Sequence, residues 1–169
     1  MKRFALLSLL VLTACATTPA QHTPSWYDDL PSFTAASYDE SRDAEADFAA
    51  ALARAQAADK HLLAIFGADW CHDSRGIAGL LETPRFAPLV AREFEVVFID
   101  VGTPQREGEA RNLDIPARYG VTGITGTPTV LAIAPDGRLV NGDTAREWRS
   151  VTGWSEDEVY ARLQALAAR

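Results

Sequence analysis

The sequence has few cysteines, few lysines and no apolar run long enough to form a permanent membrane-spanning helix. Its two cysteines are too few for a disulfide-stabilised scaffold or a cysteine-rich zinc site. No run approaches the roughly 20 apolar residues of a spanning helix, which argues against a polytopic membrane protein. Only Lys2 and Lys60 are lysines, and 23 acidic residues outnumber 16 basic ones. The net charge of −7 therefore argues against a broad affinity for nucleic acid.

The length and composition are those of one globular domain. A domain usually takes ~100–200 residues, and this chain has 169. Apolar residues make up 47% and charged residues 23%, which are ordinary values for a globular protein. A collagen, a long coiled coil and a wholly disordered chain are therefore not expected.

Residues 1–14 have the layout of a secretory signal peptide. Lys2 and Arg3 precede a nearly continuous apolar stretch over residues 4–12, which is too short for a permanent span. The segment ends in Leu12-Thr13-Ala14-Cys15, which resembles the bacterial lipoprotein box. The resemblance implies cleavage before Cys15 and acyl chains on its sulfur, which would anchor the protein in a membrane. A buried N-terminal strand or helix is the alternative.

The lipoprotein resemblance also implies a location and a tether. We expect the protein in the bacterial cell envelope, facing the periplasm. Ala16 after Cys15 favours the outer membrane over the inner one, because an Asp there commonly signals inner-membrane retention. Residues 15–37, rich in Thr, Pro and Ser, are predicted to be the lipidated N-terminus and a tether to the domain at residues 38–169. Trp26 and Phe33 are apolar for a free linker, so its later half is expected to dock on the domain or start its first strand.

The rest of the chain alternates between helical and strand patterns. Helices are predicted over residues 43–58, 71–81, 112–119 and 155–168 and from Thr83-Pro84 onward, and strands over 61–66, 95–101 and 129–134. Ser41 or Asp43 is expected to cap the first helix, and Ser155 the last. Asp136-Gly137 predicts a hairpin turn, after which residues 138–140 pair back antiparallel. This order predicts an α/β fold with a mixed sheet flanked by helices.

Cys71 is the candidate nucleophile. It follows the strand predicted at 61–66 and opens a helix, where unpaired backbone N–H groups and the positive end of the helix dipole favour the thiolate. A His72 cation would favour the thiolate further, whereas Asp73 would oppose it. The alternative is an inert buried thiol, with His72 and Asp73 as solvated residues at a helix start.

Several motifs after residue 39 occur in the order found in the thioredoxin family, which the chain therefore resembles. They are Phe66-Gly67-Ala68-Asp69-Trp70-Cys71, Tyr119-Gly120-Val121, Gly126-Thr127-Pro128-Thr129 and Asp136-Gly137. The resemblance implies a thioredoxin-like fold with a cis Thr127–Pro128 peptide bond beside Cys71. It also implies a groove in which the backbone of Thr127 pairs with an extended, cysteine-containing substrate. Trp70 would be a wall of this groove or a packing residue.

The chain departs from the family pattern at three places. Ser74 stands where the family has the second, resolving cysteine of Cys-x-x-Cys, so it either donates a hydrogen bond to the Cys71 sulfur or merely replaces the lost thiol. Ile65 stands where thioredoxins bury an Asp that helps to deprotonate the resolving cysteine. Three additional residues before Gly126 change the rim of the groove. If Cys15 is lipidated, Cys71 is the only free thiol and cannot cycle as a dithiol.

Two functions fit these residues. The first is an envelope-tethered monothiol protein that engages disulfides or thiols of proteins, or a small thiol, through Cys71 in isomerase-like or glutathione-linked exchange. As an enzyme it would be a thiol–disulfide oxidoreductase or isomerase. The alternative is an inactive binding module that recognises an envelope partner through Trp70 and Thr127-Pro128.

No metal or cofactor is predicted. His22 and His61 lack ligand spacing to Cys71, and a Cys71–His72 copper or zinc site would lack further obvious ligands. Glutaredoxin-like iron–sulfur binding would need a glutathione-containing compartment, which an exported protein lacks.

Overall fold

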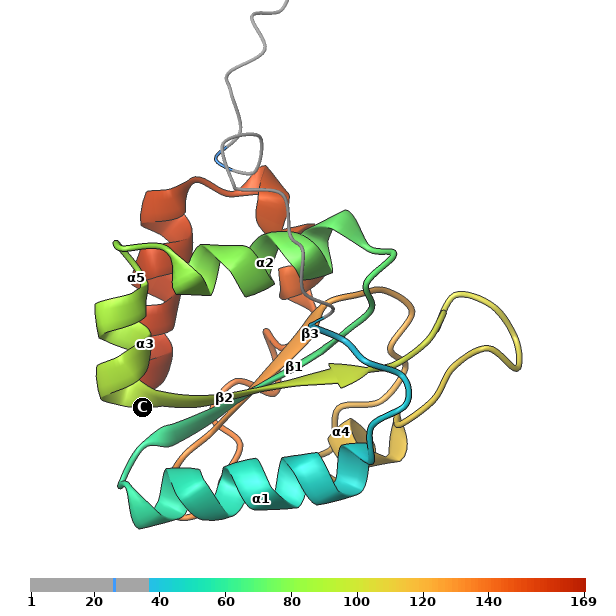
Figure 1. Cartoon of the computed structure of the whole chain (residues 1–169), viewed down its shortest axis with the longest axis horizontal. Helices are drawn as coiled ribbons and strands as arrows, with labels where there is room; N and C mark the ends of the chain where they lie inside the picture. The colour runs from blue at the N-terminus through green and yellow to red at the C-terminus, as the bar shows by residue number, and fades with distance from the viewer. Residues whose placement is uncertain (1–25, 27–36) are drawn as a thin grey trace, which may run out of the picture.

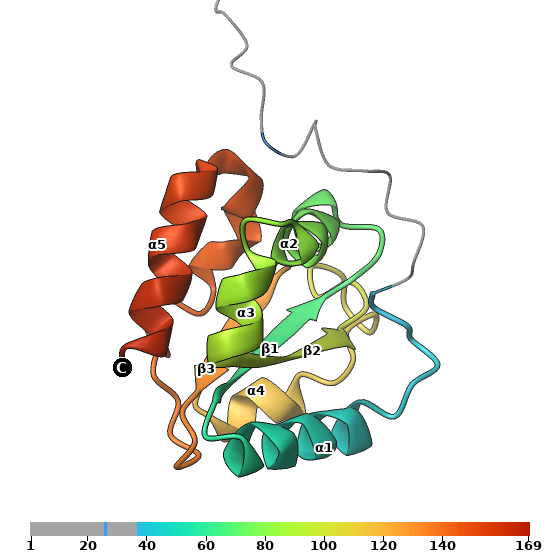
Figure 2. The same ribbon diagram turned by 60° about the vertical axis from the view of Figure 1, so that its left-hand side comes forward.

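The computed structural model describes Trp26 and residues 37–169. Within this part of the chain, a sheet lies between two helical layers (Figures 1 and 2). The strands are β1 (His61–Gly67), β2 (Phe94–Asp100) and β3 (Thr129–Ile133). One face carries α1 (Ala44–Ala57) and α4 (Asp114–Arg118), and the other carries α2 (His72–Glu82), α3 (Ala87–Glu93) and α5 (Glu156–Ala167).

The three strands form a mixed sheet in the order β2-β1-β3. Strand β1 pairs parallel with β2 and antiparallel with β3. Leu63 and Ile65 point into the core cluster under α2, α3 and α5, whereas Leu62 and Phe66 point into the cluster under α1. This alternation leaves β1 buried on both faces, as its continuous apolar run predicts. The predicted α/β fold with a mixed sheet is confirmed.

The first and last helices begin at predicted capping residues. Asp43 accepts a hydrogen bond from the backbone N–H of Ala46 at 3.0 Å. Ser155 accepts one from the N–H of Glu158 at 3.2 Å. Each side chain satisfies an N–H group that the helix itself leaves unpaired.

Helix α3 does not begin at Thr83-Pro84, so that prediction is wrong. The Thr83 hydroxyl instead donates to the carbonyl oxygen of Leu80 at 2.8 Å and so closes the end of α2. The backbone N–H groups of Phe86 and Ala87 both donate to the carbonyl of Thr83, which forms a turn. The helix follows this turn and begins at Ala87.

The hairpin turn after β3 is confirmed, but its return arm does not form a strand. Gly137 has a φ of 87° and its N–H donates to Ala134. Among the described residues after the turn, only Leu139 forms a β-bridge, with Ile133. The side chain of Asn141 then forms the hydrogen bonds to β3 that a neighbouring strand would form. Its amide oxygen accepts from Ala132 N–H at 2.8 Å, and its amide N–H donates to the Val130 carbonyl at 2.9 Å. A side chain thus satisfies this edge of β3 in place of a fourth strand.

A 3₁₀ helix that the sequence analysis did not predict, η2 (Glu147–Gly153), lies between β3 and α5. Trp148 and Val151 of η2 are buried in the core cluster under α2. The segment packs against α2 and β3. It therefore holds the start of α2 from a part of the chain that is distant in sequence.

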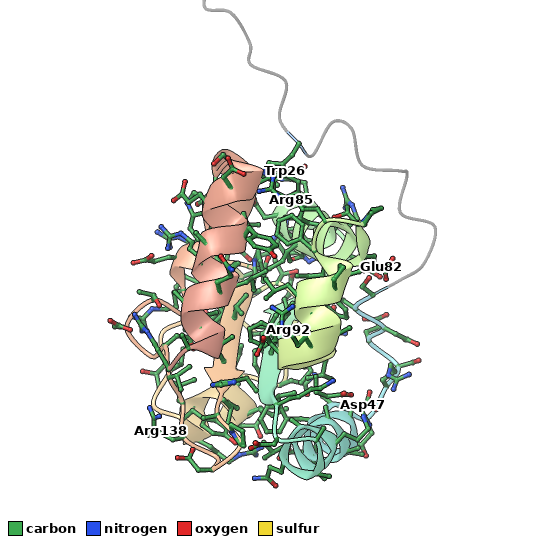
Figure 3. All side chains as sticks on the ribbon, turned by 90° about the vertical axis from the view of Figure 1, so that its left-hand side faces the viewer. Trp26, Asp47, Glu82, Arg85, Arg92 and Arg138 are labelled. Atoms are coloured by element: carbon green, nitrogen blue, oxygen red, sulfur yellow. The ribbon has the colours of Figure 1, made fainter. Side chains whose placement is uncertain are left out.

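Trp26 docks on the domain, as predicted for the later half of the tether. It is 9% exposed, belongs to the core cluster under α2 and α5, and its indole N–H donates to the carbonyl of Trp154 at 2.6 Å. Figure 3 shows it at one end of α5, beside Arg85. Apart from Trp26 and Ser37, the tether residues and the predicted signal peptide lie outside the described residues. No helix in the described part of the chain is long and apolar enough to cross a membrane.

Candidate active site

Cys71 lies at the N-terminus of α2, directly after the turn that leaves β1. Its backbone is extended (φ −87°, ψ 122°), and its carbonyl accepts the first hydrogen bond of the helix, from Arg75 N–H. The side chain is 8% exposed, and the thiol donates to the carbonyl oxygen of Thr127 at 3.3 Å. The peptide bond between Thr127 and Pro128 is cis. The structure therefore brings Cys71, Thr127 and Pro128 together, as the sequence analysis expected.

Among the described residues, Trp70 is the one large apolar side chain that is exposed. It is 52% exposed, and its indole N–H donates to the carbonyl oxygen of Gly102 at 3.1 Å. This hydrogen bond fixes the ring against the loop that follows β2. Trp70 is therefore not a core packing residue, and it stands on the other side of Cys71 from the Thr127 loop.

Asp73 is buried, so the alternative that it is a solvated residue at a helix start is wrong. It is 7% exposed, and its Oδ1 accepts hydrogen bonds from the backbone N–H of Thr152 at 2.9 Å and from its hydroxyl at 2.7 Å. His72 is largely exposed, and its Nε2 lies 3.1 Å from the Asp73 Oδ2. Asp73 thus ties the first turn of α2 to η2, two residues after the candidate nucleophile.

Ser74 is fully buried beneath Cys71 and bonds to the backbone rather than to the sulfur. Its Oγ accepts a hydrogen bond from the N–H of Ala68 at 3.4 Å. Among the described residues, no hydrogen bond joins this hydroxyl to Cys71. A β-carbon on Gly67 would lie 2.7 Å from the Ser74 Oγ and 2.6 Å from the Tyr38 ring, so only glycine fits there.

Tyr38 is a buried site residue that the sequence analysis missed. Its hydroxyl donates to the carbonyl oxygen of Ser74 at 3.1 Å, and its ring meets Phe98 edge-on at 5.4 Å. Burial, followed by the negative charge that Cys71 would carry as a thiolate, raises the pKa of the Tyr38 hydroxyl well above its usual value. Tyr38 therefore stays a proton donor at neutral pH. The apolar character of the chain just before it was the signal available in the sequence.

Ile65 is fully buried in the interior of β1, where the resemblance places an acid in thioredoxins. Cys15 and His22 lie outside the described residues, and His61 lies at the opposite end of β1 from Cys71. The described residues contain no group of three or more His, Cys, Asp or Glu side chains that could hold a metal ion.

The comparisons with known proteins agree with this geometry. A family model described as thioredoxin-like matches residues 43–135. The chain belongs to the thioredoxin-like family. It is also similar to a solved structure described as a disulphide isomerase from Xylella fastidiosa Temecula1, with 30% sequence identity and a TM-score of 0.69. That similarity covers 79% of this chain and 98% of the other. No curated protein matches the chain.

The family model ends before one of the residues that shape the site. Its match stops at residue 135, whereas Thr152, which holds Asp73, lies in η2. Nothing in the local sequence around Thr152 indicates a partner 79 residues earlier. Only the packing of η2 against α2 brings the two residues together.

Proposed function

We propose that this protein exchanges disulfides through the single thiol of Cys71. The observation that carries the proposal is the position of that thiol at the N-terminus of α2, beside the loop that holds the cis Thr127–Pro128 peptide bond. The similarity to a protein described as a disulphide isomerase supports it. Proteins with disulfides or thiols are the proposed partners, and a small thiol is a further one.

The proposed reaction begins when the Cys71 thiolate attacks one sulfur of a substrate disulfide. A bond forms between Cys71 Sγ and that sulfur, the substrate S–S bond breaks, and the other substrate sulfur leaves as a thiolate. The N–H groups at the start of α2 stabilise the attacking charge. A thiolate of the substrate or of a small thiol then attacks the substrate sulfur of the mixed disulfide. A new S–S bond forms to that sulfur, the bond to Cys71 Sγ breaks, and Cys71 leaves as a thiolate. No electrons are gained or lost overall, so the reaction rearranges disulfides without net reduction.

Ser74 explains why the proposed chemistry is exchange rather than net oxidation or reduction. A resolving thiol at this position would attack the mixed disulfide from within the chain, and a hydroxyl cannot form that bond. Ile65 fits the same interpretation, since position 74 has no thiol for an acid to deprotonate. Release of the substrate therefore depends on a thiol from outside the chain.

The experiment uses the full chain with Cys15→Ser, in which Cys71 is the only thiol, and the same chain with Cys71→Ser as its matched control. Each is incubated with a protein whose disulfides have been scrambled, and thiols are then blocked with an alkylating agent. The proposal predicts a disulfide-linked complex and recovery of native disulfides in the chain that keeps Cys71. Equal recovery with the Cys71→Ser chain would overturn it.

A second function is favoured by the burial of Cys71. Its thiol is 8% exposed and donates a hydrogen bond to the Thr127 carbonyl, which suits a structural thiol. In this second function the fold is a binding module that holds an envelope partner at exposed Trp70 and the Thr127 loop. Binding of such a partner would survive Cys71→Ser and be lost in Trp70→Ala.

We further propose that Cys15 is lipidated and anchors the domain in the bacterial envelope, facing the periplasm. The lipoprotein box at Leu12-Thr13-Ala14-Cys15 supports this location, and Ala16 favours the outer membrane. The test is incorporation of a labelled fatty acid and recovery in the outer-membrane fraction when the chain is produced in a Gram-negative bacterium. Cys15→Ser should abolish both, and Cys71→Ser should change neither. Unchanged labelling of the Cys15→Ser chain would contradict the anchor.

A further inference from the structure

A hollow of about 290 Å³ lies beside the loop that carries Thr127. Gly126 forms one wall, and the residues before and within η2 form the other. The charged side chains that line it are Asp143, Arg146, Glu147 and Arg149. The hollow is therefore next to the proposed substrate groove and is formed largely by charged groups.

Arg149 reaches the loop beside the reactive sulfur. Its Cδ lies 3.2 Å from the position that a β-carbon on Gly126 would take. Gly126 directly precedes Thr127, whose carbonyl oxygen lies 3.3 Å from the Cys71 sulfur. An extended substrate that runs along Thr127 would consequently pass the side chain of Arg149.

Neither arginine of the hollow forms an ion pair with a carboxylate among the described residues. Arg146 donates to a backbone carbonyl, that of Thr122, at 2.7 Å. Arg149 has no hydrogen bond or ion pair with any of the described residues. Of the carboxylates that face them, Glu147 is paired with Arg162 at 3.1 Å, which leaves Asp143 to oppose two guanidinium groups.

This arrangement is unusual in a chain that carries a net charge of −7. Most exposed arginines elsewhere in the described residues lie against carboxylates, as in the pairs Arg42–Asp47, Arg54–Glu95, Arg92–Glu93, Arg111–Glu40 and Arg118–Glu45. Unpaired guanidinium groups beside the groove are therefore available to an anion from outside the chain.

The other side of Cys71 has the opposite charge. A second hollow there is lined by Trp70 and the carboxylates of Asp39, Glu40, Asp69 and Asp100. Arg111 pairs with Glu40 and Asp100, which leaves Asp39 and Asp69 as the carboxylates without an arginine partner among the described residues. Because β1 lies between β2 and β3, the end of β2 at Asp100 and the start of β3 at Thr129 stand on opposite sides of the strand that leads to Cys71. The field across the site therefore favours a substrate whose negative charge lies on the Arg149 side.

The geometry points to Arg149, assisted by Arg146, as the binding site for a carboxylate carried by the substrate close to its disulfide. This inference rests on the proposed exchange at Cys71 and names its substrate class. The carboxylate belongs either to an acidic residue of a protein near its cysteine or to a small thiol such as glutathione. Guanidinium groups suit this role because they donate two parallel hydrogen bonds to a carboxylate.

The test compares two probe disulfides on the full Cys15→Ser chain at low ionic strength. Dithiobis(nitrobenzoate) carries carboxylates and dithiodipyridine carries none, and each releases a coloured thiol as Cys71 forms the mixed disulfide. We expect Arg149→Gln to lower the ratio of the anionic to the neutral rate constant by about threefold to tenfold. Salt at about 0.5 M should shrink the ratio in the unaltered chain, because exposed charges are then screened.

Arg92→Gln is the matched control, because it removes the same charge at the far end of the sheet. Arg92 lies in α3, just before Phe94, which pairs with the first residue of β1 rather than its last. The ratio of the anionic to the neutral rate constant in Arg92→Gln should equal that of the unaltered chain. An unchanged ratio in Arg149→Gln, or an equal fall in Arg92→Gln, would overturn the inference.

Two outcomes separate this inference from the proposal on which it rests. If Cys71 reacts with neither probe, the proposed exchange fails and the inference fails with it. If Cys71 reacts with both and Arg149→Gln leaves the ratio unchanged, only the inference fails. If Arg149→Gln lowers the ratio, its effect on two further reactions identifies the source of the carboxylate. One reaction is with glutathione disulfide, and the other is with disulfide peptides that carry Glu or Gln beside the cysteine.

Discussion

The sulfur of Cys71 and the carbonyl oxygen of Thr127 lie 3.3 Å apart, although 56 residues separate them in the sequence. The antiparallel pairing of β1 with β3 produces this contact. Phe66 pairs with Thr129, so the residues that follow β1 and those that precede β3 meet at one edge of the sheet. The sheet register, rather than any local motif, thus places a backbone carbonyl beside the thiol.

Asp73 lies two residues from this thiol, and its charge and its hydrogen bonds can be tested separately. Both bonds from Thr152 end on Oδ1, which Asp73→Asn keeps while it removes the charge. We expect Asp73→Asn to raise the alkylation rate of Cys71 severalfold, because a nearby negative charge disfavours the thiolate. Asp73→Ala should lower the free energy of unfolding by about 1–3 kcal/mol, because it also leaves the part-buried Thr152 donors without their acceptor.

Urea unfolding and iodoacetamide kinetics measure both effects of changing Asp73. The Thr152→Val chain serves as a control, since it removes only the hydroxyl hydrogen bond and keeps the charge. A slower alkylation rate in Asp73→Asn would show that Asp73 assists the nucleophile rather than opposing it.

Ser74→Cys should convert the monothiol site into a dithiol one. Ser74 is fully buried in the first turn of α2, and cysteine differs from serine there by one atom. In the Cys15→Ser background we expect oxidation to remove both free thiols of the variant. We also expect the variant to reduce insulin in the presence of dithiothreitol at least tenfold faster than its parent. Free thiols that persist after oxidation would contradict the assignment of position 74 as the missing resolving cysteine.

Much of this site could be predicted because its signals are local. The apolar run of β1, the position of Cys71 at the strand–helix junction and the caps Asp43 and Ser155 depend on neighbours within a few residues. The helix start at Ala87 was missed because the Thr83 hydroxyl can bond backward to Leu80 as well as forward, and the sequence does not say which.

The features that the sequence did not reveal depend on distant partners. Thr152 reaches Asp73 only because η2 packs on α2, and Tyr38 reaches Ser74 across 36 residues. Asn141 ends the pairing of β3 with its side chain, which the strand-like pattern of residues 138–140 does not indicate. These contacts form only after the sheet and its two layers are assembled.

Tyr38→Phe tests the buried hydroxyl beneath the site. The phenylalanine keeps the edge-on contact with Phe98 and loses the hydrogen bond to the Ser74 carbonyl, so we expect a loss of about 1 kcal/mol of unfolding free energy at pH 7. The raised pKa of Tyr38 means that the folded chain keeps this proton at a pH where the unfolded chain releases it. Stability from this group is therefore present below about pH 10 and falls as the pH rises further.

Urea midpoints at pH 8 and pH 10.5 measure the two effects of the Tyr38 hydroxyl. The midpoint of the unaltered chain should fall further between these values than that of Tyr38→Phe. An equal fall in both chains would show that the Tyr38 hydroxyl is not the group that titrates.

His61 predicts a loss of stability in mild acid. Burial lowers the pKa of His61 below its usual value, and its Nε2 has no hydrogen-bond partner among the described residues. The unfolded chain therefore binds a proton at this residue more readily than the folded chain. The contribution of neutral His61 is complete above about pH 6.5 and is lost as the pH falls below that value. Between pH 7.5 and 5.5, the urea midpoint should fall less in His61→Gln than in the unaltered chain, and a larger fall would contradict this account.

The alkylation rate of Cys71 in the folded Cys15→Ser chain tests the central claim most directly. Iodoacetamide kinetics from pH 5.5 to 9 would be compared with those of the same chain unfolded in urea and corrected for the effect of urea on a free thiol. A reactive nucleophile predicts faster labelling in the folded chain at pH 6–7, because the start of α2 stabilises the thiolate. Labelling that is slower in the folded chain at every pH would show a protected structural thiol. That result would contradict exchange at Cys71 and favour the binding module.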